Sequence, residues 1–263
     1  MNVVAILSAS DRFDLFTTAA AQRGDMTAAV VEKDFWVCWT LKQLFTMDNY
    51  RDHLLFKGGT SLSKVFGLIQ RFSEDIDLAV DWELLGYVGD KSPLADLSKT
   101  KRAKLLDAML KDCRAFIGGE FVAALRARFA AVLGSEAGWS LEQDPNALDT
   151  LIFEYPRTEV EPLDYIQPAV VLELGTHAEF IPNDRYKVQP YAAETFPQAF
   201  NQPGCSVTAI KAERTFLEKL TILHAEHHRP PDRPFPQRYS RHYYDLAVMA
   251  DSEAGEAAVK DAG

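Results

Sequence analysis

Residues 56–77 contain the residue types that phosphoryl chemistry needs. The stretch reads FKGGTSLSKVFGLIQRFSEDID, in which a short apolar segment runs into Gly58 and Gly59 and a helical pattern follows. A Gly-Gly turn lets the backbone come close to a ligand, and a helix N-terminus offers free N–H groups to phosphate. Thr60 and Ser61 add hydroxyl groups at the same end. The first half of the stretch therefore predicts a phosphate-binding turn.

Two carboxylates stand at the start of the next predicted strand, residues 76–80. Side chains alternate along a strand, so Asp75 and Asp77 are expected on one face. Two carboxylates on one face can share hard cations such as Mg²⁺. A pair of such ions can bridge the attacking and leaving oxygens of a phosphoryl transfer. A triphosphate cradle beside metal-binding carboxylates is the layout that a nucleotidyltransferase needs.

Other nucleotide-binding motifs are absent from the sequence. It contains neither GxxxxGK[ST] nor GxGxxG. Taken alone, Gly58 and Gly59 could form an ordinary tight turn, and Asp75 and Asp77 could mark a solvated strand end. Their combination in this order favours the functional interpretation.

The elements that must position these residues are predicted from hydrophobic periodicity and from the residues that break helices. Helices are expected at residues 11–21, 26–45, 61–68, 98–117, 119–133, 208–226 and 238–250. Strands are expected at residues 54–56, 76–80, 150–155, 169–174 and 186–192. The four prolines of residues 229–236 exclude a regular element there, and residues 251–263 are expected to fray. This order predicts an α/β domain over residues 1–200 and a helical C-terminal lobe over residues 201–263 that completes the active site.

Composition and charge limit the class of protein. The 263 residues include 28 Lys+Arg and 38 Asp+Glu, a formal net charge of −10, which disfavours a generally basic nucleic-acid binder. The three cysteines lie far apart, so we expect no disulfide framework or zinc knuckle and a reducing cytoplasm. No apolar run approaches the roughly 20 residues that a membrane helix needs, and no signal-peptide pattern opens the chain.

One stretch runs against this acidic balance. Residues 205–245 hold more Lys and Arg than Asp and Glu. The cations are Lys211, Arg214, Lys219, Arg229, Arg233, Arg238 and Arg241. We call them the C-terminal basic wall, and we expect them to face the metal site and to serve an RNA acceptor.

The segments GGTSLSKV and RFSEDIDL resemble the signature of the DNA polymerase beta-like nucleotidyltransferase superfamily. More narrowly, they resemble the AbiEii/AbiGii group, to which the MenT toxins belong and which supplies the toxin components of bacterial toxin–antitoxin and phage-abortive systems. The resemblance extends upstream to VEKDF at residues 31–35. It extends downstream to Arg214, to Glu218 and Lys219, and to Asp245, so it covers about residues 30–250.

The resemblance implies a fold, a reaction and partners. It implies a polymerase beta-like mixed sheet flanked by helices, with a helical C-terminal lobe. It implies transfer of a nucleoside monophosphate from an NTP, with release of pyrophosphate. A tRNA 3′ end is then a plausible acceptor, growth arrest a plausible outcome and an antitoxin the expected partner. These motifs do not specify the NTP, the acceptor or the oligomeric state.

The resemblance also assigns roles to residues. Nucleotide binding falls to Gly58, Gly59, Thr60, Ser61, Lys64 and Lys219, and catalysis to Asp75, Asp77, Lys219 and Asp245. Asp75 and Asp77 would hold Mg²⁺ or Mn²⁺. Glu173, which alternates with Leu172 and Leu174, is the candidate for a third metal carboxylate, the other interpretation being a solvent-facing strand residue.

Several alternatives remain open at this stage. The acceptor could be a protein or a small hydroxylated molecule, or the chain could be a non-catalytic nucleotide-binding module. Lys33 and Asp34 could form a structural ion pair or belong to the site. His224 and His228 could bind zinc, although a polar helix end is the simpler interpretation, and the tyrosines at residues 239, 243 and 244 are expected to be core rather than base-stacking residues.

Overall fold

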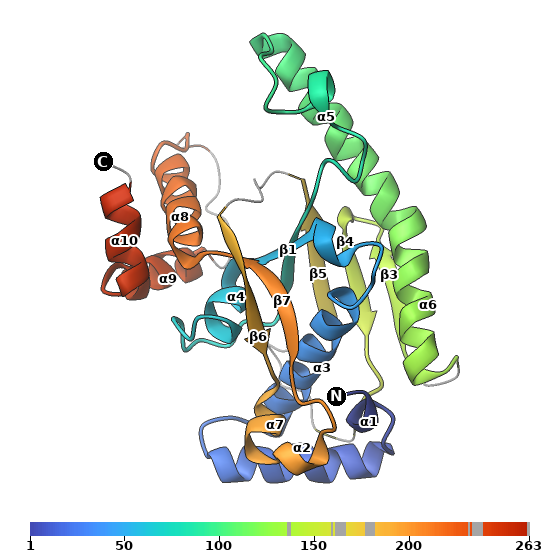
Figure 1. Cartoon of the computed structure of the whole chain (residues 1–263). Helices are drawn as coiled ribbons and strands as arrows, with labels where there is room; N and C mark the ends of the chain where they lie inside the picture. The colour runs from blue at the N-terminus through green and yellow to red at the C-terminus, as the bar shows by residue number, and fades with distance from the viewer. Residues whose placement is uncertain are drawn as a thin grey trace.

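The computed structural model describes residues 1–135, 138–158, 160, 167–176, 182–230, 232 and 239–261 (Figure 1). The strands are β1 (Leu54–Lys57), β2 (Ile76–Val80), β3 (Ser140–Asp144), β4 (Ala147–Glu154), β5 (Val170–Gly175), β6 (Asn183–Val188) and β7 (Cys205–Ile210). The α-helices are α1 (Asn2–Ala5), α2 (Ala9–Arg23), α3 (Ala28–Leu44), α4 (Gly58–Lys64), α5 (Lys99–Phe116), α6 (Val122–Leu133), α7 (Tyr191–Thr195), α8 (Ala212–His227), α9 (Ser240–Ala250) and α10 (Glu253–Asp261). Shorter turns are η1 (Arg51–His53), η2 (Gly89–Lys91), the π turn η3 (Ile117–Phe121) and η4 (Pro197–Ala199).

These strands form one seven-stranded mixed sheet in the order β3-β4-β5-β2-β1-β7-β6. β1 and β2 pair in antiparallel fashion at its centre, while β2 and β5 run parallel. The register places Asp77 of β2 between Lys57 of β1 and Glu173 of β5. The predicted mixed α/β architecture is therefore confirmed, and two of the predicted acids, Asp77 and Glu173, lie on its neighbouring strands β2 and β5.

The main core is built around α3. Its residues are buried on every side except at a few positions, and the buried set includes the charged residues Glu32, Lys33 and Asp34 as well as apolar ones. Trp36 and Trp39 are fully buried and pack against Phe153 and Tyr155 of the neighbouring strand segment. α3 therefore provides a fixed central element, against which the site segments can be positioned.

α5, η3 and α6 form one continuous helical run, in place of the two separate helices expected at residues 98–117 and 119–133. The Gly118-Gly119 pair widens the helix into a π turn without ending it. An added Cβ on Gly118 would collide with the amide of Gln143, so the glycine admits the β3 side chain. Figure 1 shows the N-terminal half of α5 extending beyond the sheet.

The C-terminal region differs from the expectation in two places. Residues 208–210, predicted as helix, belong to β7, where Val207 and Ala209 are buried on alternate positions as in a strand. The helical part therefore begins at Ala212. Residues 253–261, predicted to fray, form α10, whose Ala258 is buried against a small second core. The predicted helix at 238–250 is present as α9, and most of residues 229–236 lie outside the described residues.

None of the helices in the described part of the chain is long and apolar enough to cross a lipid bilayer.

Candidate active site

Two glycines open α4, and each leaves room for a different charged group. Gly58 has φ +78°, and an added Cβ would collide with the carboxylate of Asp77. At Gly59 an added Cβ would lie 2.8 Å from Ser73 Oγ and 2.9 Å from Arg71 Nη2. The Gly-Gly turn therefore brings the start of α4 against a carboxylate and a guanidinium group of the same chain.

Asp77 and Glu173 lie side by side on parallel strands. They line a pocket of about 380 Å³ together with Lys57, Asp149 and Thr150. Burial, with the neighbouring Glu173 carboxylate, raises the pKa of Asp77 to about 6. Burial and the charge of Asp75 likewise raise the pKa of Glu173. The structure thus places Glu173 beside the predicted acidic pair.

This acidic group suits a divalent cation by its chemistry. Carboxylate oxygens are the ligands that Mg²⁺ and Mn²⁺ prefer, and a cation between these groups would relieve the repulsion that raises their pKa values. In the described part of the chain, no three acidic, histidine or cysteine side chains already converge as ligands of one ion. Asp77 and Glu173 share the pocket, whereas Asp75 precedes β2 and acts on both through its charge.

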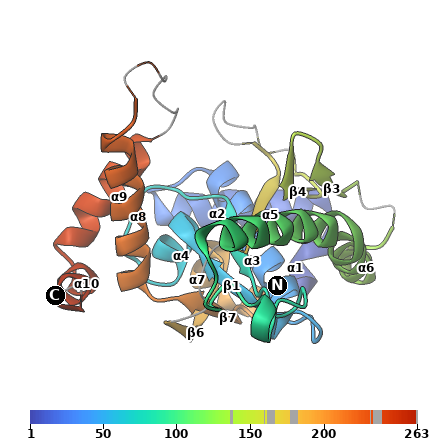
Figure 2. The ribbon, with the colours of Figure 1, turned by 90° about the horizontal axis from the view of Figure 1, so that it is seen from above.

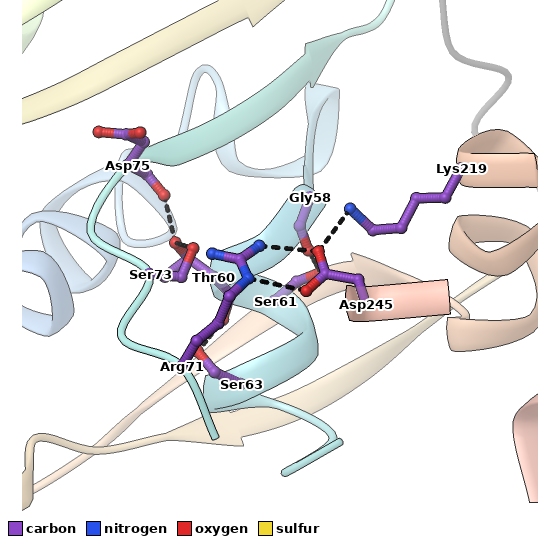
Figure 3. A network of polar contacts seen from close by, with 9 residues as sticks. All are labelled: Gly58, Thr60, Ser61, Ser63, Arg71, Ser73, Asp75, Lys219 and Asp245. Carbon is purple, nitrogen blue, oxygen red and sulfur yellow. Dashed lines mark hydrogen bonds and ion pairs between the residues drawn. The ribbon is translucent and has the colours of Figure 1, made fainter. Parts of the chain in front are cut away.

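The hydroxyl groups of Thr60 and Ser61 make internal hydrogen bonds (Figure 3). Both residues are fully buried. Thr60 donates to the backbone carbonyl of Asp75 and lies 3.0 Å from Ser73 Oγ, while Ser61 donates to the carbonyl of Gly58 at 2.9 Å. These hydroxyls fix the acidic segment to the Gly-Gly turn, so contacts to a nucleotide at this end of α4 would come from backbone N–H groups.

Asp245 of α9 joins two cations from distant segments (Figure 3). It is fully buried and accepts two hydrogen bonds from Arg71, from Nε and Nη2, each at 2.7 Å. Lys219 Nζ of α8 lies 2.9 Å from the same carboxylate. Burial alone would raise the pKa of Asp245, but the hydrogen bonds from Arg71 and the Lys219 charge hold it below its ordinary value. Arg71 was not among the predicted site residues, although it precedes the Asp75 motif in RFSEDID.

His242 of α9 lies close to the same cluster. Burial is the largest cause that lowers the pKa of His242 to about 4, and the charges of Lys219, Arg241 and Arg71 add to it, while the charge of Asp245 opposes them. These cations are of the type that binds an anion such as a phosphate group.

Lys64 contacts Asp34 and Tyr191 in this structure, whereas the sequence predicted a contact with nucleotide phosphates. Its Nζ is 2.7 Å from Asp34 of α3 and 3.7 Å from the centroid of the Tyr191 ring, and both charged side chains are almost fully buried. It lines a separate pocket of about 710 Å³ with Lys187 and Cys205. Its charge is already neutralised by Asp34, which links α4 to the central helix.

The neighbouring residues of α3 make the same kind of link. Glu32 accepts from the backbone N–H and the hydroxyl of Thr158, each at 3.0 Å. Lys33 is 3.0 Å from Glu74, next to the acidic motif. Lys33 and Asp34 are thus paired with Glu74 and Lys64, not with each other. Three consecutive residues of α3 hold three different segments of the chain, two of which adjoin the site.

The structure also bears on the histidine pair, on two tyrosines of α9 and on one cysteine. His224 and His228 have ring centroids 4.7 Å apart, but no metal-binding cluster includes them among the described residues. Tyr243 and Tyr244 are exposed by 51% and 41%, so the expectation that they pack in a core is wrong. Cys38 of α3 is fully buried.

Three of the five described members of the C-terminal basic wall lie beside acids. Arg214 lies 3.6 Å from Glu218, Arg229 lies 2.6 Å from Glu226, and Lys219 is held by Asp245. Its members Arg233 and Arg238 lie outside the described residues. Arg241 is exposed, and its charge lowers the pKa values of Asp77 and Glu173.

Comparison with known protein families identifies the class of protein to which this fold and site belong. Residues 39–262 match the family described as nucleotidyl transferase AbiEii toxin of type IV toxin–antitoxin systems. Because the match covers most of the chain, this protein belongs to the AbiEii family of nucleotidyltransferase toxins. The resemblance of GGTSLSKV and RFSEDIDL to the AbiEii/AbiGii group is confirmed.

One solved structure and the curated proteins complete the comparison. The structure of MenT4, a nucleotidyltransferase toxin from Mycobacterium tuberculosis H37Rv, is similar over 95% of this chain and 92% of that chain, with 15% identity and a TM-score of 0.46. No curated protein matches this sequence.

Proposed function

We propose that this protein transfers a nucleoside monophosphate from an NTP to a hydroxyl group at the 3′ end of a tRNA. The acceptor oxygen forms a bond to the α-phosphorus, the bond from that phosphorus to the β-phosphate oxygen breaks, and pyrophosphate leaves. One observation supports this most directly. An acidic group and a cation cluster meet at the same Gly-Gly turn, with Gly58 against Asp77 and Gly59 against Arg71.

The acidic side would hold a divalent cation, Mg²⁺ or Mn²⁺, through Asp75, Asp77 and Glu173. When bound, such a cation neutralises phosphate charge and makes the attacking hydroxyl easier to deprotonate. The carboxylates are poised for this role because burial and mutual repulsion raise the pKa values of Asp77 and Glu173. Without a cation, the ionised carboxylates of Asp77 and Glu173 repel each other at neutral pH.

The cation side would hold the triphosphate. Arg71 and Lys219 converge on Asp245, and the free N–H groups of Gly58 to Ser61 point from the start of α4. Phosphoryl transfer is catalysed mainly by positioning and charge stabilisation, which this arrangement supplies. We assign Asp245 to positioning the two cations and Lys64 to anchoring α4.

The family implies an NTP substrate and an antitoxin partner. We propose that the reaction takes place in the cytoplasm, where NTPs and tRNA are available. The identity of the base is left to the experiment below.

The test is transfer of label from each α-³²P NTP to total tRNA, to a protein extract and to small hydroxylated acceptors in parallel. We expect cation-dependent labelling of tRNA, abolished by EDTA and by the double variant Asp75→Ala/Asp77→Ala. The exposed acid Asp48, 83% accessible, supplies a matched control in Asp48→Ala. Labelling of protein or of a small molecule in place of tRNA would overturn the acceptor, and equal labelling by the double variant would overturn the catalytic assignment.

A further inference from the structure

α5 is strongly basic in an acidic protein. Over residues 99–116 it carries six Lys or Arg and two Asp, a net charge of +4 in a chain of −10. The cations are Lys99, Lys101, Arg102, Lys104, Lys111 and Arg114. Several of them lie in the first turns of the helix, where the macrodipole disfavours positive charge. The sequence therefore concentrates like charges where they lower the stability of the free helix.

Three of these lysines form a stripe along one face. Lys101, Lys104 and Lys111 are separated by three and seven residues, a spacing that places side chains on one side of a helix. All three are exposed, and none forms an ion pair with a residue that the structure describes. The buried face of α5, with Met109 and Cys113, points elsewhere. We call these three residues the lysine stripe.

The two arginines of α5 have structural partners. Arg102 donates to the carbonyl groups of Pro93 and Ala95, at 3.2 and 3.3 Å. Arg114 lies 3.3 Å from Asp149 on β4. These two residues fix the helix at both ends, so the lysine stripe and the exposed Lys99 are the cations of α5 without an ion pair to any described residue.

The C-terminal end of α5 reaches the acidic pocket. Asp149, the partner of Arg114, lines the same pocket as Asp77 and Glu173. Lys101 is thirteen residues before Arg114, which corresponds to about 20 Å along a helix. No residue of α5 before Met109 is buried, and this half of the helix projects beyond the sheet (Figure 1). Figure 2 shows α5 and α8 on opposite sides of α4, as Figure 1 does.

The chemistry of the stripe favours nucleic acid over a protein partner. Protein interfaces have apolar centres, often with aromatic residues. The exposed large apolar side chains of the described residues include none from α5. Lysine ammonium groups on a polar surface instead match the regularly spaced charges of a phosphate backbone.

We propose that Lys101, Lys104 and Lys111 bind the phosphate backbone of the acceptor RNA, and so hold it on α5 while its 3′ end reaches the acidic pocket. This proposal rests on the proposed function, since it requires an RNA acceptor. It names a docking surface away from the reacting atoms, on the opposite side of α4 from α8.

The experiment compares two triple variants that remove the same charge. Lys101→Gln/Lys104→Gln/Lys111→Gln removes the stripe, and Arg185→Gln/Lys187→Gln/Lys260→Gln removes three exposed cations from β6 and α10. Binding of tRNA is measured by fluorescence anisotropy over a KCl series without NTP. Transfer is measured with tRNA and with a trinucleotide acceptor that is too short to reach α5.

We expect the stripe variant to reduce the slope of log K against log[KCl] by about 2 to 3, because each phosphate contact contributes about one. Its KM for tRNA should rise about tenfold at moderate salt, since three ionic contacts are lost. The KM for the trinucleotide and the kcat values should not change, and the control variant should behave as wild type in every measurement.

The outcomes separate this inference from the proposed function. If wild-type protein labels tRNA and the stripe variant keeps the wild-type slope and KM, the inference is overturned, whatever else the lysines bind, an acidic protein partner included. An equal loss in both triple variants would also overturn it, because the effect would then be one of net charge. If the wild type neither binds nor labels RNA, the acceptor assignment itself fails.

Discussion

The charged Asp77 carboxylate, which the proposed function needs, lowers the stability of the folded protein. Its pKa of about 6 in the folded protein exceeds the ordinary value of 3.8, so the folded state binds this proton more tightly than the unfolded state does. The charged Asp77 therefore lowers the free energy of unfolding. This effect is absent below about pH 4, develops as the pH rises to about 6 and is complete above it. We therefore predict that Asp77→Asn stabilises the metal-free protein at neutral pH by about 2 kcal/mol.

Urea unfolding at pH 7.5 and at pH 4 measures this effect. The difference between Asp77→Asn and wild type should be present at pH 7.5 and small at pH 4. The variant should also lose cation-dependent transfer. A variant that is less stable than wild type at pH 7.5 would contradict the assignment of Asp77 as a strained acid.

Asp245 is predicted to act through Arg71 and Lys219. Removal of one partner of a buried ion pair leaves the other charge uncompensated and costs about 3–5 kcal/mol. Asp245→Ala should therefore lower stability and raise the KM for NTP. A double-mutant cycle of Arg71→Ala and Asp245→Ala should give a coupling of about 1–3 kcal/mol in both stability and kcat/KM. Additive effects on kcat/KM would show that the two residues act separately.

The residues of the site were predictable from sequence to the extent that a local motif places them. Asp77 and Glu173 alternate with apolar neighbours, which made each a candidate, but their pairing follows from the sheet register, which the strand pattern does not give. Arg71 escaped prediction because its role depends on Asp245, 174 positions away. Lys64 was assigned to phosphate because it follows the Gly-Gly turn, but its partner Asp34 comes from α3 and could not be foreseen from spacing.

The element that carries the chemistry is the turn from β1 into α4, and its glycines can be tested against a matched position. Gly67 has φ +63° with no atom within 4 Å of an added Cβ, so Gly67→Ala carries only backbone strain, about 1–2 kcal/mol. Gly58→Ala has a similar φ and also displaces the Asp77 carboxylate. We predict a larger loss of stability for Gly58→Ala and loss of cation-dependent transfer, measured by urea unfolding and by the labelling assay. Equal behaviour of the two variants would mean that Asp77 does not need this approach.

α4 is also held from its other side, by Lys64 on Asp34. Lys64→Met should lower stability by about 3 kcal/mol, because Asp34 is left as a buried unpaired charge. Adding Asp34→Asn should restore much of that stability, because both charges are then absent. If Lys64 only anchors α4, the KM for NTP rises in Lys64→Met and returns to the wild-type value in the double variant. A KM that stays high after stability is restored would return Lys64 to the phosphate-binding set.

At the same scale, elements with a clear period were predicted and elements with mixed signals were not. β2 occurs at the predicted residues 76–80, since its apolar run is bounded by acids on one side. Residues 208–210 were assigned to a helix because they adjoin the strong helical pattern of α8, yet pairing with β1 and β6 makes them strand. α10 is polar and rich in Ala and Gly, and it is ordered by a tertiary contact of Ala258.

On the scale of the whole molecule, the described residues form a large core, a small core and a cluster of three residues on the central strands, Leu55, Ala79 and Ile210. The large core surrounds α3 and the sheet, whereas the small one joins α8, α9 and α10 to α4. The small core consists of Leu62, Ile69, Ala212, Phe216, Met249 and Ala258. Because it buries little apolar surface, the C-terminal helices should open at a lower free energy than the sheet does. The cations that meet at Asp245 come from both parts, so a bound nucleotide would tie them together.

The last prediction concerns this second core. All four tryptophans lie outside α8–α10, and Trp36, Trp39 and Trp139 belong to the large core or pack against it. Tryptophan fluorescence therefore follows that core and not the C-terminal helices, while amide hydrogen exchange reports each helix. Met249 is fully buried, and Met249→Ala should cost about 2–5 kcal/mol locally. We expect faster exchange confined to α8–α10, an unchanged fluorescence midpoint and reduced transfer. NTP with a divalent cation should restore protection, because a ligand that binds only the closed state stabilises it. Val259→Ala, at a residue 65% exposed in the same lobe, is the control and should change none of these. If Met249→Ala shifts the fluorescence midpoint as much as it accelerates exchange in α8–α10, the two cores unfold as one unit, and the nucleotide does not act by joining them.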